Sequence, residues 1–537
     1  MLEYEKKISG AFFTSSDISH YLTERVIENK NQIVLEPSFG DGSFINAIID
    51  HYIDMGWYDS LSQNIYAVEI REKAILQYIT NPFLDSEKLF FGDFIGIEPF
   101  PVDIVIGNPP YIGLNKIPTS EQERAKKLLS AHNFNMQSNG SLWFPFIMHS
   151  CAFLNNGGTL AFILPFEITY VKYSRQLWKY LSQHFSELTI IRVYEDIFPD
   201  VDVETILFIA KGFGGSTNSV NYEIYDSRIH LVNGMILKNA NISIESILNA
   251  ERPFVSNLLD SDHLEIINKL RVNGYIKPIN HFCKFKIGYV SADQQFFHPN
   301  DYVANYFGIA DEDLVPSIVN AKSLKKDIGL EIKQHQVLSR LFYPKIAKVN
   351  HPYIKHGEIM GVNTRYKCRQ RKTWYITPNI EIPDIILTVF GDKPRLYVNS
   401  GRYAASNSLL CGFLQQESLS PSQIALSWYN SLTLLSIELR VHSLGGGVLV
   451  FIPGEADSIE ILDPRKIFNV DDKYFSDLEV LLRNSSFDDA YLVGDKYSLP
   501  SIGLSDNEIY LLQDAVKILR KWRNSRRRKK SLFNVME

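Results

Sequence analysis

An Asn-Pro-Pro-Tyr run that starts at Asn108 carries the most specific chemistry in the sequence. It follows a short apolar segment, residues 103–107, which predicts that the run leaves the end of a buried strand. The exocyclic amine of adenine is a weak nucleophile because its lone pair is delocalised into the ring. The Asn108 amide oxygen and the Pro109 carbonyl would each accept one N–H of that amine and favour a more tetrahedral nitrogen. Pro109 and Pro110 stiffen the loop, and Tyr111 offers a flat face on which a base can stack.

Three shorter segments lie upstream of this run. Residues 36–42 form a glycine-bearing turn that lets the backbone approach a ligand closely, and Glu36 suits an ammonium and would repel a pyrophosphate. Glu69 ends the next predicted strand, where carboxylates commonly hold ribose hydroxyls. Asp93 can accept a hydrogen bond from an adenine amino group while Phe94 packs on the ring. Each segment alone is compatible with a tight turn, a solvated acid or a helix cap, but the three in this order predict a site for S-adenosylmethionine.

The elements that must position these residues alternate between strands and helices over the first ~240 residues. The candidate strands are short, apolar and rich in β-branched residues. They are residues 33–36, 65–69, 103–107, 158–164, 188–194 and 205–211. The pattern predicts an α/β fold with a doubly wound, Rossmann-like and mostly parallel sheet, whose ligands sit at the carboxyl ends of the strands. A stretch rich in Gly, Ser and Asn, residues 212–219, predicts a loop after the last of these strands.

The composition sets the class of protein. The chain has 537 residues, of which 45% are hydrophobic and 22% charged, which is typical of a globular protein with more than one core. Its net charge of −6 means that a nucleic-acid surface must be a local patch. None of the four cysteines pairs at CxxC spacing, and no signal peptide or membrane-length apolar stretch is seen, so we expect a cytoplasmic protein. We expect a catalytic domain over residues 1–245, an irregular α+β domain over 246–505 and a helical, basic tail over 506–537.

The order of the segments resembles the gamma class of N6-adenine DNA methyltransferases, the modification enzymes of type II restriction–modification systems. The resemblance covers roughly residues 8–211 and rests on the sequences GAFFT, LEPSFGDGSF, AVEI, GDF and NPPY. It implies S-adenosylmethionine as the only cofactor, no metal, and direct transfer of a methyl group to an adenine flipped out of double-stranded DNA. The donor contacts that it implies come from Thr14, Glu36, Pro37, Ser38, Gly40, Gly42, Glu69, Ile70, Asp93, Phe94, Asn108 and Phe146.

The resemblance also assigns the target adenine to Asn108, Pro109, Pro110 and Tyr111. It implies that Phe198 stacks on the adenine opposite Tyr111, although the spacing of Phe198 is equally compatible with packing in the core.

The region after residue 245 resembles the family's target-recognition domain less sharply. Residues 288–297 (GYVSADQQFF) are similar to a GxVTGxNxFF pattern, with departures at Ser291, Ala292 and Gln294. Further segments of this kind are residues 366–375, 405–409 and 445–449. Five of the eight residues in 365–372 are Lys or Arg, next to two aromatic residues, which favours a DNA contact over a solvated edge strand. The predicted DNA-binding residues are Lys367, Arg369, Arg371, Lys372 and Trp374.

Other functions stay open at this point. NPPY loops also occur in methyltransferases that act on a protein glutamine or on guanine in ribosomal RNA, where the nitrogen lone pair is delocalised in the same way. An inert DNA-specificity component would not need the intact turn and NPPY run. The size of the C-terminal region favours double-stranded DNA as the partner. We expect a monomer, and a nuclease acting at the same DNA site would be a separate chain.

Overall fold

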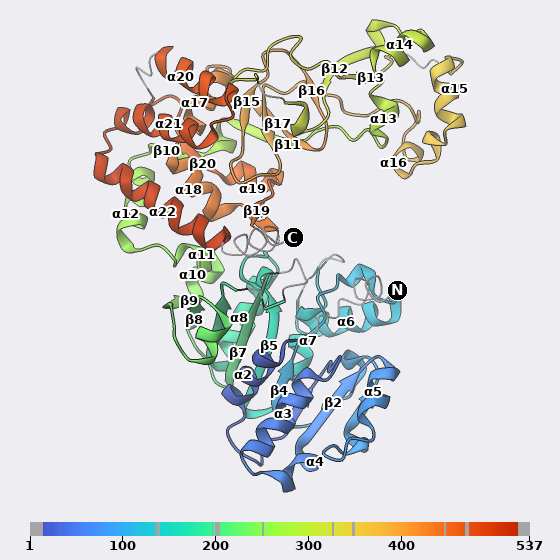
Figure 1. Cartoon of the computed structure of the whole chain (residues 1–537), viewed down its shortest axis with the longest axis vertical. Coiled ribbons are helices and arrows are strands. Elements are labelled where there is room, and N and C mark those ends of the chain that lie inside the picture. The colour runs from blue at the N-terminus through green and yellow to red at the C-terminus, as the bar shows by residue number, and fades with distance from the viewer. Residues whose placement is uncertain are drawn as a thin grey trace, which may run out of the picture. The chain divides into compact units, whose positions relative to one another are not determined.

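The computed structural model describes residues 14–134, 136, 140–195, 197–198, 204–249, 252–324, 327–345, 349–444, 447–467 and 472–524. The chain divides into two compact units, each with its own core. Unit 1 contains the chain up to Leu258 together with Asn524, and unit 2 is Leu259–Arg523; Figure 1 colours them from blue to green and from green to red. Every helix of the described residues is too short or too polar to cross a membrane.

Unit 1 is built on one sheet of nine strands in the order β3-β2-β1-β4-β5-β7-β6-β8-β9 (Figure 1). In that order the strands are Leu89–Phe91, Ile65–Glu69, Val34–Glu36, Val102–Gly107, Leu154–Pro165, Thr205–Phe213, Phe185–Val193, Ser219–Tyr225 and Lys238–Ser243. The strands from β3 to β5 pair in parallel, whereas β7 is antiparallel to both of its neighbours. This sheet confirms the predicted α/β, doubly wound fold.

The strand order places a crevice between β1 and β4. From β1 the chain builds β2 and β3 on one side, and then returns to build β4 and β5 on the other. In a doubly wound sheet the connections diverge at this switch point, so a ligand can enter between the carboxyl ends of the two central strands. Glu36 is the last residue of β1, and Asn108 directly follows the last residue of β4. The sheet therefore brings two residues 72 positions apart to one edge.

Helices cover the sheet and complete the core of unit 1. They are α2 (Ser16–Val26), α3 (Ser43–Asp54), α4 (Leu61–Asn64), α5 (Glu72–Tyr78), α6 (Thr119–Ala131), α7 (Trp143–Cys151), α8 (Ser174–His184), α9 (Arg228–Val232), α10 (Ile244–Asn249) and α11 (Pro253–Ser256). Central strands such as β4 are apolar along almost their whole length because both faces of the sheet are covered.

The six strands predicted from the sequence are all present, with shifted ends. Residues 65–69 match β2, whereas β5 begins at Leu154, before the predicted start at 158. The predicted loop at 212–219 is shorter, because β7 continues to Phe213 and β8 begins at Ser219. Three further strands, β3, β8 and β9, were not predicted. β3 has only three residues, and exposed residues alternate along β9, so neither has the apolar run of a central strand.

Unit 2 is irregular, as predicted for an α+β region. Its strands are β10 (Ile276–Pro278), β11 (Cys283–Ile287), β12 (Leu314–Ile318), β13 (Arg340–Phe342), β14 (Ile385–Thr388), β15 (Leu396–Val398), β16 (Ala404–Ala405), β17 (Leu409–Leu414), β18 (Ser443–Leu444), β19 (Val448–Leu449) and β20 (Glu460–Leu462). Its described strands form several small sheets, of which the largest has the order β11-β17-β14-β15.

The helices of unit 2 are α12 (Ser261–Val272), α13 (Gln294–Phe297), α14 (Asp301–Phe307), α15 (Pro352–Ile359), α16 (Tyr366–Arg369), α17 (Pro421–Trp428), α18 (Ser431–Arg440), α19 (Pro453–Ser458), α20 (Asp472–Arg483), α21 (Phe487–Ser501) and α22 (Asp506–Asn524). The predicted start of the second domain, residue 246, falls inside α10, and the predicted tail begins with α22. The basic run at residues 526–530 lies outside the described residues.

Candidate active site

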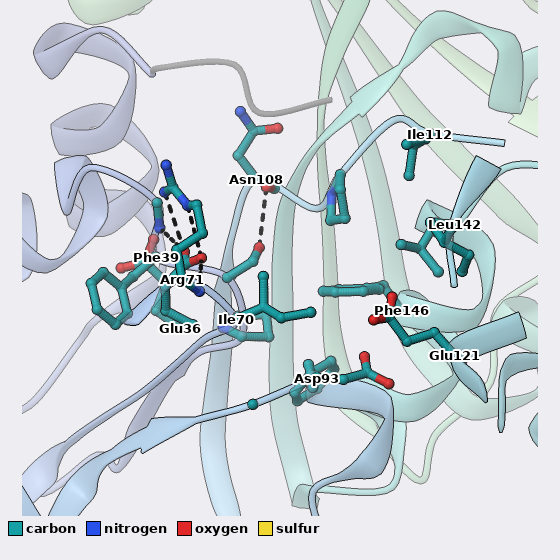
Figure 2. A pocket seen from close by; sticks show the side chains of 18 of the residues that line it. Glu36, Phe39, Ile70, Arg71, Asp93, Asn108, Ile112, Glu121, Leu142 and Phe146 are labelled. Carbon is teal, nitrogen blue, oxygen red and sulfur yellow. Dashed lines mark hydrogen bonds and ion pairs between the residues drawn. The ribbon is translucent and has the colours of Figure 1, made fainter. Parts of the chain in front are cut away.

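A cavity of about 370 Å³ opens at the carboxyl ends of β1, β2 and β4. Figure 2 shows Asn108 at one end of it and Asp93 at the other, with Ile70 and Phe146 between them. All but one of the residues predicted to bind the donor line this cavity. They are Thr14, Glu36, Pro37, Ser38, Gly40, Glu69, Ile70, Asp93, Phe94, Asn108 and Phe146. The exception is Gly42, which lies behind the cavity wall at the start of α3.

The turn after β1 depends on its glycines. Gly40 and Gly42 have φ angles of +60° and +83°, in the left-handed region that L-residues with a side chain adopt at a cost. A Cβ on Gly42 would lie 1.8 Å from the hydroxyl of Tyr78, which donates a hydrogen bond to the Asp41 carbonyl at 3.0 Å. The side chain of Tyr78 therefore packs directly against the turn and fixes it over the start of α3.

Glu36 is a buried carboxylate that lacks a full set of partners. Its side chain is 2% exposed, and among the described residues Oε2 accepts no hydrogen bond. Burial raises the pKa of Glu36 well above its ordinary value, and the charges of Asp41 and Glu69 raise it further. A buried acceptor without a donor costs about 1–3 kcal/mol, and more when it is charged. The cavity therefore has a position that a cationic hydrogen-bond donor would stabilise.

The second predicted carboxylate, Glu69, is held by the protein. Its Oε2 accepts from the Gly40 amide at 2.7 Å, and its Oε1 accepts from the backbone amide and Nε of Arg71 at 2.9 and 3.0 Å. Both residues line the cavity, and Figure 2 shows Arg71 among the lining side chains. The sequence pattern did not point to Arg71. A ribose hydroxyl would have to share Glu69 with Arg71 or displace it.

The far end of the cavity is aromatic with an acidic edge. The rings of Phe94 and Phe146 pack at 5.2 Å between centroids, and both residues line the cavity. Asp93 caps the short helix that begins at Phe94, and its Oδ2 accepts from Nε of Arg124 on α6 at 2.9 Å. Burial raises the pKa of Glu121, also on α6, and the charge of Asp93 raises it further. Neither Arg124 nor Glu121 could be predicted from the sequence, because no motif covers α6.

The side chain and the backbone carbonyl of Asn108 are both hydrogen-bonded. Its Nδ2 donates to Thr14 Oγ1 at 3.3 Å, and its Oδ1 accepts from the hydroxyl of Tyr111 at 2.7 Å. Its backbone carbonyl accepts from Ser38 Oγ at 3.2 Å. These contacts come from segments that precede α2 and follow β1, and from the NPPY loop itself. The amide oxygen is therefore presented in one orientation at the rim of the cavity.

The other residues predicted for the target base are Pro109, Pro110, Tyr111 and Phe198, and of these the cavity is lined by Pro110 alone. Pro109 and Tyr111 lie beside it, and the Tyr111 hydroxyl also lies 2.9 Å from the carbonyl oxygen of Ile163. Phe198 is 5% exposed and belongs to the hydrophobic core of unit 1. In this conformation the ring of Phe198 offers no open face, so its stacking role stays a prediction that requires it to move.

In unit 2, the side chain of Arg371 is hydrogen-bonded to backbone carbonyls of two chain segments. Its Nη2 donates to the carbonyls of Val290 and Ser291 at 2.7 and 3.0 Å, and its Nη1 donates to the carbonyl of Trp374 at 3.2 Å. The guanidinium also lies 5.0 Å above the ring of Phe297. These bonds join two segments that the sequence had singled out separately. They use three of the five N–H donors of the guanidinium, so the predicted DNA contact of Arg371 stays a prediction that this geometry does not favour.

Trp374 is likewise engaged within unit 2. Its ring packs against Phe296 at 5.3 Å, and its Nε1 donates to Glu358 Oε1 at 3.3 Å. By contrast, Lys367, Arg369 and Lys372 have exposed side chains. They lie on α16 and the turn after it, so this basic segment is helical and is not an edge strand. The exposed members of the predicted set therefore form a basic surface, which we call the α16 surface.

Comparisons with known proteins agree with both units. Residues 58–198 match the model of the Eco57I restriction-modification methylase, and residues 251–499 match that of the C-terminal domain of type II methyltransferase M.Eco57I. The chain is 24% identical over 496 residues to the type II methyltransferase M.AccI of Acinetobacter calcoaceticus, covering 86% of each chain. It is 30% identical over 212 residues to the type II methyltransferase M.HincII of Haemophilus influenzae, covering 38% of each.

A solved structure shares the fold. The DrdV–DNA complex, determined by cryo-electron microscopy, aligns with a TM-score of 0.50 at 11% identity. The alignment covers 79% of this chain and 54% of that chain, so this chain spans about half the length of DrdV. At this identity the likeness concerns the fold alone.

Proposed function

We propose that this chain transfers a methyl group from S-adenosylmethionine to N6 of an adenine in double-stranded DNA. The premise is that it belongs to the type II restriction–modification methyltransferases. One observation carries the proposal. The acceptor oxygen of Asn108 is fixed at the rim of a cavity whose buried Glu36 carboxylate lacks a donor. This pairs an acceptor for a target amine with a site for a cationic amino acid.

The cavity suits a methyl donor built from adenosine and an amino acid. Glu36 would pair with the donor's ammonium group, and Asp93 would accept from its adenine amine. Ile70, Phe94 and Phe146 would pack against the adenine ring. The donor supplies a methyl group on a positively charged sulfur, which needs no further activation. What the protein has to do is hold the donor and the target nitrogen in line.

Replacing Glu36 with Gln is expected to stabilise the donor-free protein and weaken donor binding. The carboxyl has a pKa near 4.5 in the unfolded chain and a raised pKa in the folded protein. Between these two pKa values the folded state binds more protons than the unfolded state, so the protein loses stability as the pH rises from one to the other. Gln does not titrate, so at about pH 8 the variant should melt a few degrees higher, and the gain should vanish toward about pH 4. Calorimetric titration should show donor affinity about 10- to 100-fold weaker, because a charge-assisted bond is lost.

Asp50→Asn serves as the control for this substitution, since Asp50 is exposed and pairs with His20 at the surface. It should change neither property appreciably. A Glu36→Gln variant that binds the donor as tightly as the wild type would contradict the ammonium assignment.

At the end of the cavity where Asn108 lies, the Asn108 Oδ1 and the Pro109 carbonyl would each accept one N–H of the target amine. The target adenine would be flipped out of the duplex, which costs a few kcal/mol. Stacking on the ring of Tyr111, and on Phe198 if that ring moves, would offset about 1–3 kcal/mol of this cost for the stacked base. Transfer is direct, with no covalent intermediate on the enzyme.

Two other functions are outcomes of the test. The first is methylation of a protein glutamine or of ribosomal RNA, and the second is DNA binding without chemistry. Unit 2 argues against the first because it adds a large second core and the exposed, basic α16 surface. The closed network around Asn108 argues against the second, since an inert component would not need it.

Modification-sensitive sequencing of plasmid DNA from cells that express the protein tests the proposal. We expect N6-methyladenine in one defined sequence context, and none with an empty vector. Purified protein with radiolabelled donor should label unmodified plasmid DNA and leave RNA and protein unlabelled. N4-methylcytosine in place of N6-methyladenine would contradict the adenine assignment, and unmodified DNA with labelled RNA or protein would contradict the DNA substrate.

On the α16 surface, Arg369→Ala is expected to weaken DNA binding about three- to tenfold without changing the melting temperature. Arg369 is exposed, so its loss removes charge from the surface and leaves the core intact. If the contact is to a phosphate, the slope of log affinity against log salt should fall by about 1. Arg371→Ala is the matched comparison, and it should lower the melting temperature because it breaks hydrogen bonds to Val290 and Ser291. An Arg371 variant with unchanged stability and altered site preference would restore the direct DNA role.

A further inference from the structure

The hydroxyl of Tyr111 lies between two acceptors. It is 2.7 Å from Asn108 Oδ1 and 2.9 Å from the carbonyl oxygen of Ile163 on β5. A phenol carries one hydrogen, so it can make only one of these two bonds fully at any moment. Burial raises the pKa of Tyr111 well above its ordinary value, which keeps that hydrogen in place.

The position of this hydroxyl follows from the way β4 leaves the sheet. The last pair of the ladder between β4 and β5 is Gly107 with Phe162, and Ile163 is the next residue along β5. Pro109 and Pro110 have no N–H groups, so the chain after Asn108 cannot extend the ladder with them. The Tyr111 side chain folds back and supplies a donor at the point where the backbone does not.

The other contacts of Asn108 set which way its amide faces. With Nδ2 donating to Thr14 Oγ1 and the backbone carbonyl held by Ser38, Oδ1 faces the Tyr111 hydroxyl. That same oxygen is the one that has to accept from the target amine. An amide oxygen that already accepts from a phenol is a weaker acceptor for a second donor, since its electron density is shared.

We propose that the Tyr111 hydroxyl is a positioning group for the target amine, distinct from the stacking role of its ring. Before the base arrives, it donates to Asn108 and holds the amide in the productive orientation. When the amine donates to Oδ1, the hydroxyl turns its hydrogen to the Ile163 carbonyl and leaves the full acceptor strength of Asn108 to the substrate. This role rests on the proposed function, because it needs a target amine.

Tyr111→Phe isolates the hydroxyl, because it keeps the ring. We expect the single-turnover rate of methyl transfer, at saturating donor and DNA, to fall about tenfold, the value of one hydrogen bond to a reacting site. Donor affinity should stay within about twofold of the wild type. The fluorescence of 2-aminopurine at the target position, which reports base extrusion, should also be unchanged. Tyr111→Ala should reduce that fluorescence change as well, because it removes the stacking face.

Two controls separate positioning from stability. Tyr52 is buried in the same unit, and its hydroxyl donates to the carbonyl of Gln32 at 3.1 Å, away from the cavity. Tyr52→Phe should lower the melting temperature slightly and leave the transfer rate unchanged. In an Asn108→Ala background, Tyr111→Phe should have no further effect on the rate, because the hydroxyl acts through Asn108.

Several results would overturn this role while leaving the proposed function intact. One is a Tyr111→Phe variant that is as active as an active wild type. Another is a rate loss in this variant that is matched by a loss of donor affinity or of base extrusion. A third is an effect of Tyr111→Phe on the rate that persists in the Asn108→Ala background. A wild type that methylates no adenine in DNA would overturn the proposed function, and this role with it.

Discussion

Asn108→Ala is expected to lower the rate of methyl transfer about 1,000-fold, because it removes the preorganised acceptor for the target amine. The structure fixes this amide through Thr14 and Tyr111, so little reorganisation is needed when the amine arrives. Single-turnover measurements at saturating donor and DNA report this step directly. Donor affinity should change little, since Glu36 and the aromatic end of the cavity lie elsewhere in it.

Asn108→Asp is the matched variant, because it keeps an oxygen acceptor and replaces only the amide nitrogen. We expect it to retain more activity than the alanine variant, although it loses the donor to Thr14. If both variants transfer methyl groups at the wild-type rate, Asn108 does not orient the amine. If the alanine variant instead fails to bind the donor, the residue belongs to the donor site alone.

The sequence predicted the strands that carry the site because those strands are buried on both faces. β2 and β4 are apolar along almost their whole length, as strands covered on both faces must be. β9 was missed for the opposite reason. It is the edge strand of the sheet, and exposed residues alternate along it, so its composition resembles that of a loop.

The donor cavity could be predicted because its residues follow strand ends. The doubly wound order brings Glu36, Glu69 and Asn108 to one edge, and a motif at each strand end is therefore a motif of one cavity. Arg124 comes from a helix that no motif marks, so only the tertiary structure shows that it pairs with Asp93. The same limit applies to Arg371, whose charge suggests a surface although its partners are backbone carbonyls.

Arg523→Met is expected to destabilise unit 2 by about 3–5 kcal/mol, because the buried carboxylate of Glu438 loses its bidentate partner. Arg523 is 5% exposed and makes a bidentate pair with Glu438, at 2.8 and 2.7 Å, and a further ion pair with Asp392 at 3.0 Å. It also donates to the carbonyl of Gly447, and so ties the last helix to the segment before β19. Differential scanning calorimetry of the full chain should show the melting temperature falling by roughly 10 °C.

Two further variants test whether the buried charge causes this loss. Arg340 also binds two carboxylates, Asp301 and Asp311, but both are exposed, so Arg340→Met should cost less than about 1 kcal/mol. Adding Glu438→Leu to Arg523→Met should recover part of the lost stability, because it removes the buried carboxylate that has lost its bidentate partner. That recovery cannot be complete, since Glu438 also lies 3.4 Å from Arg520, which the second substitution deprives of a partner. The contrary result is a double variant whose free energy of unfolding is lower than that of Arg523→Met by a further ~3–5 kcal/mol. In that case packing around Arg523, and not its charge, stabilises this part of unit 2.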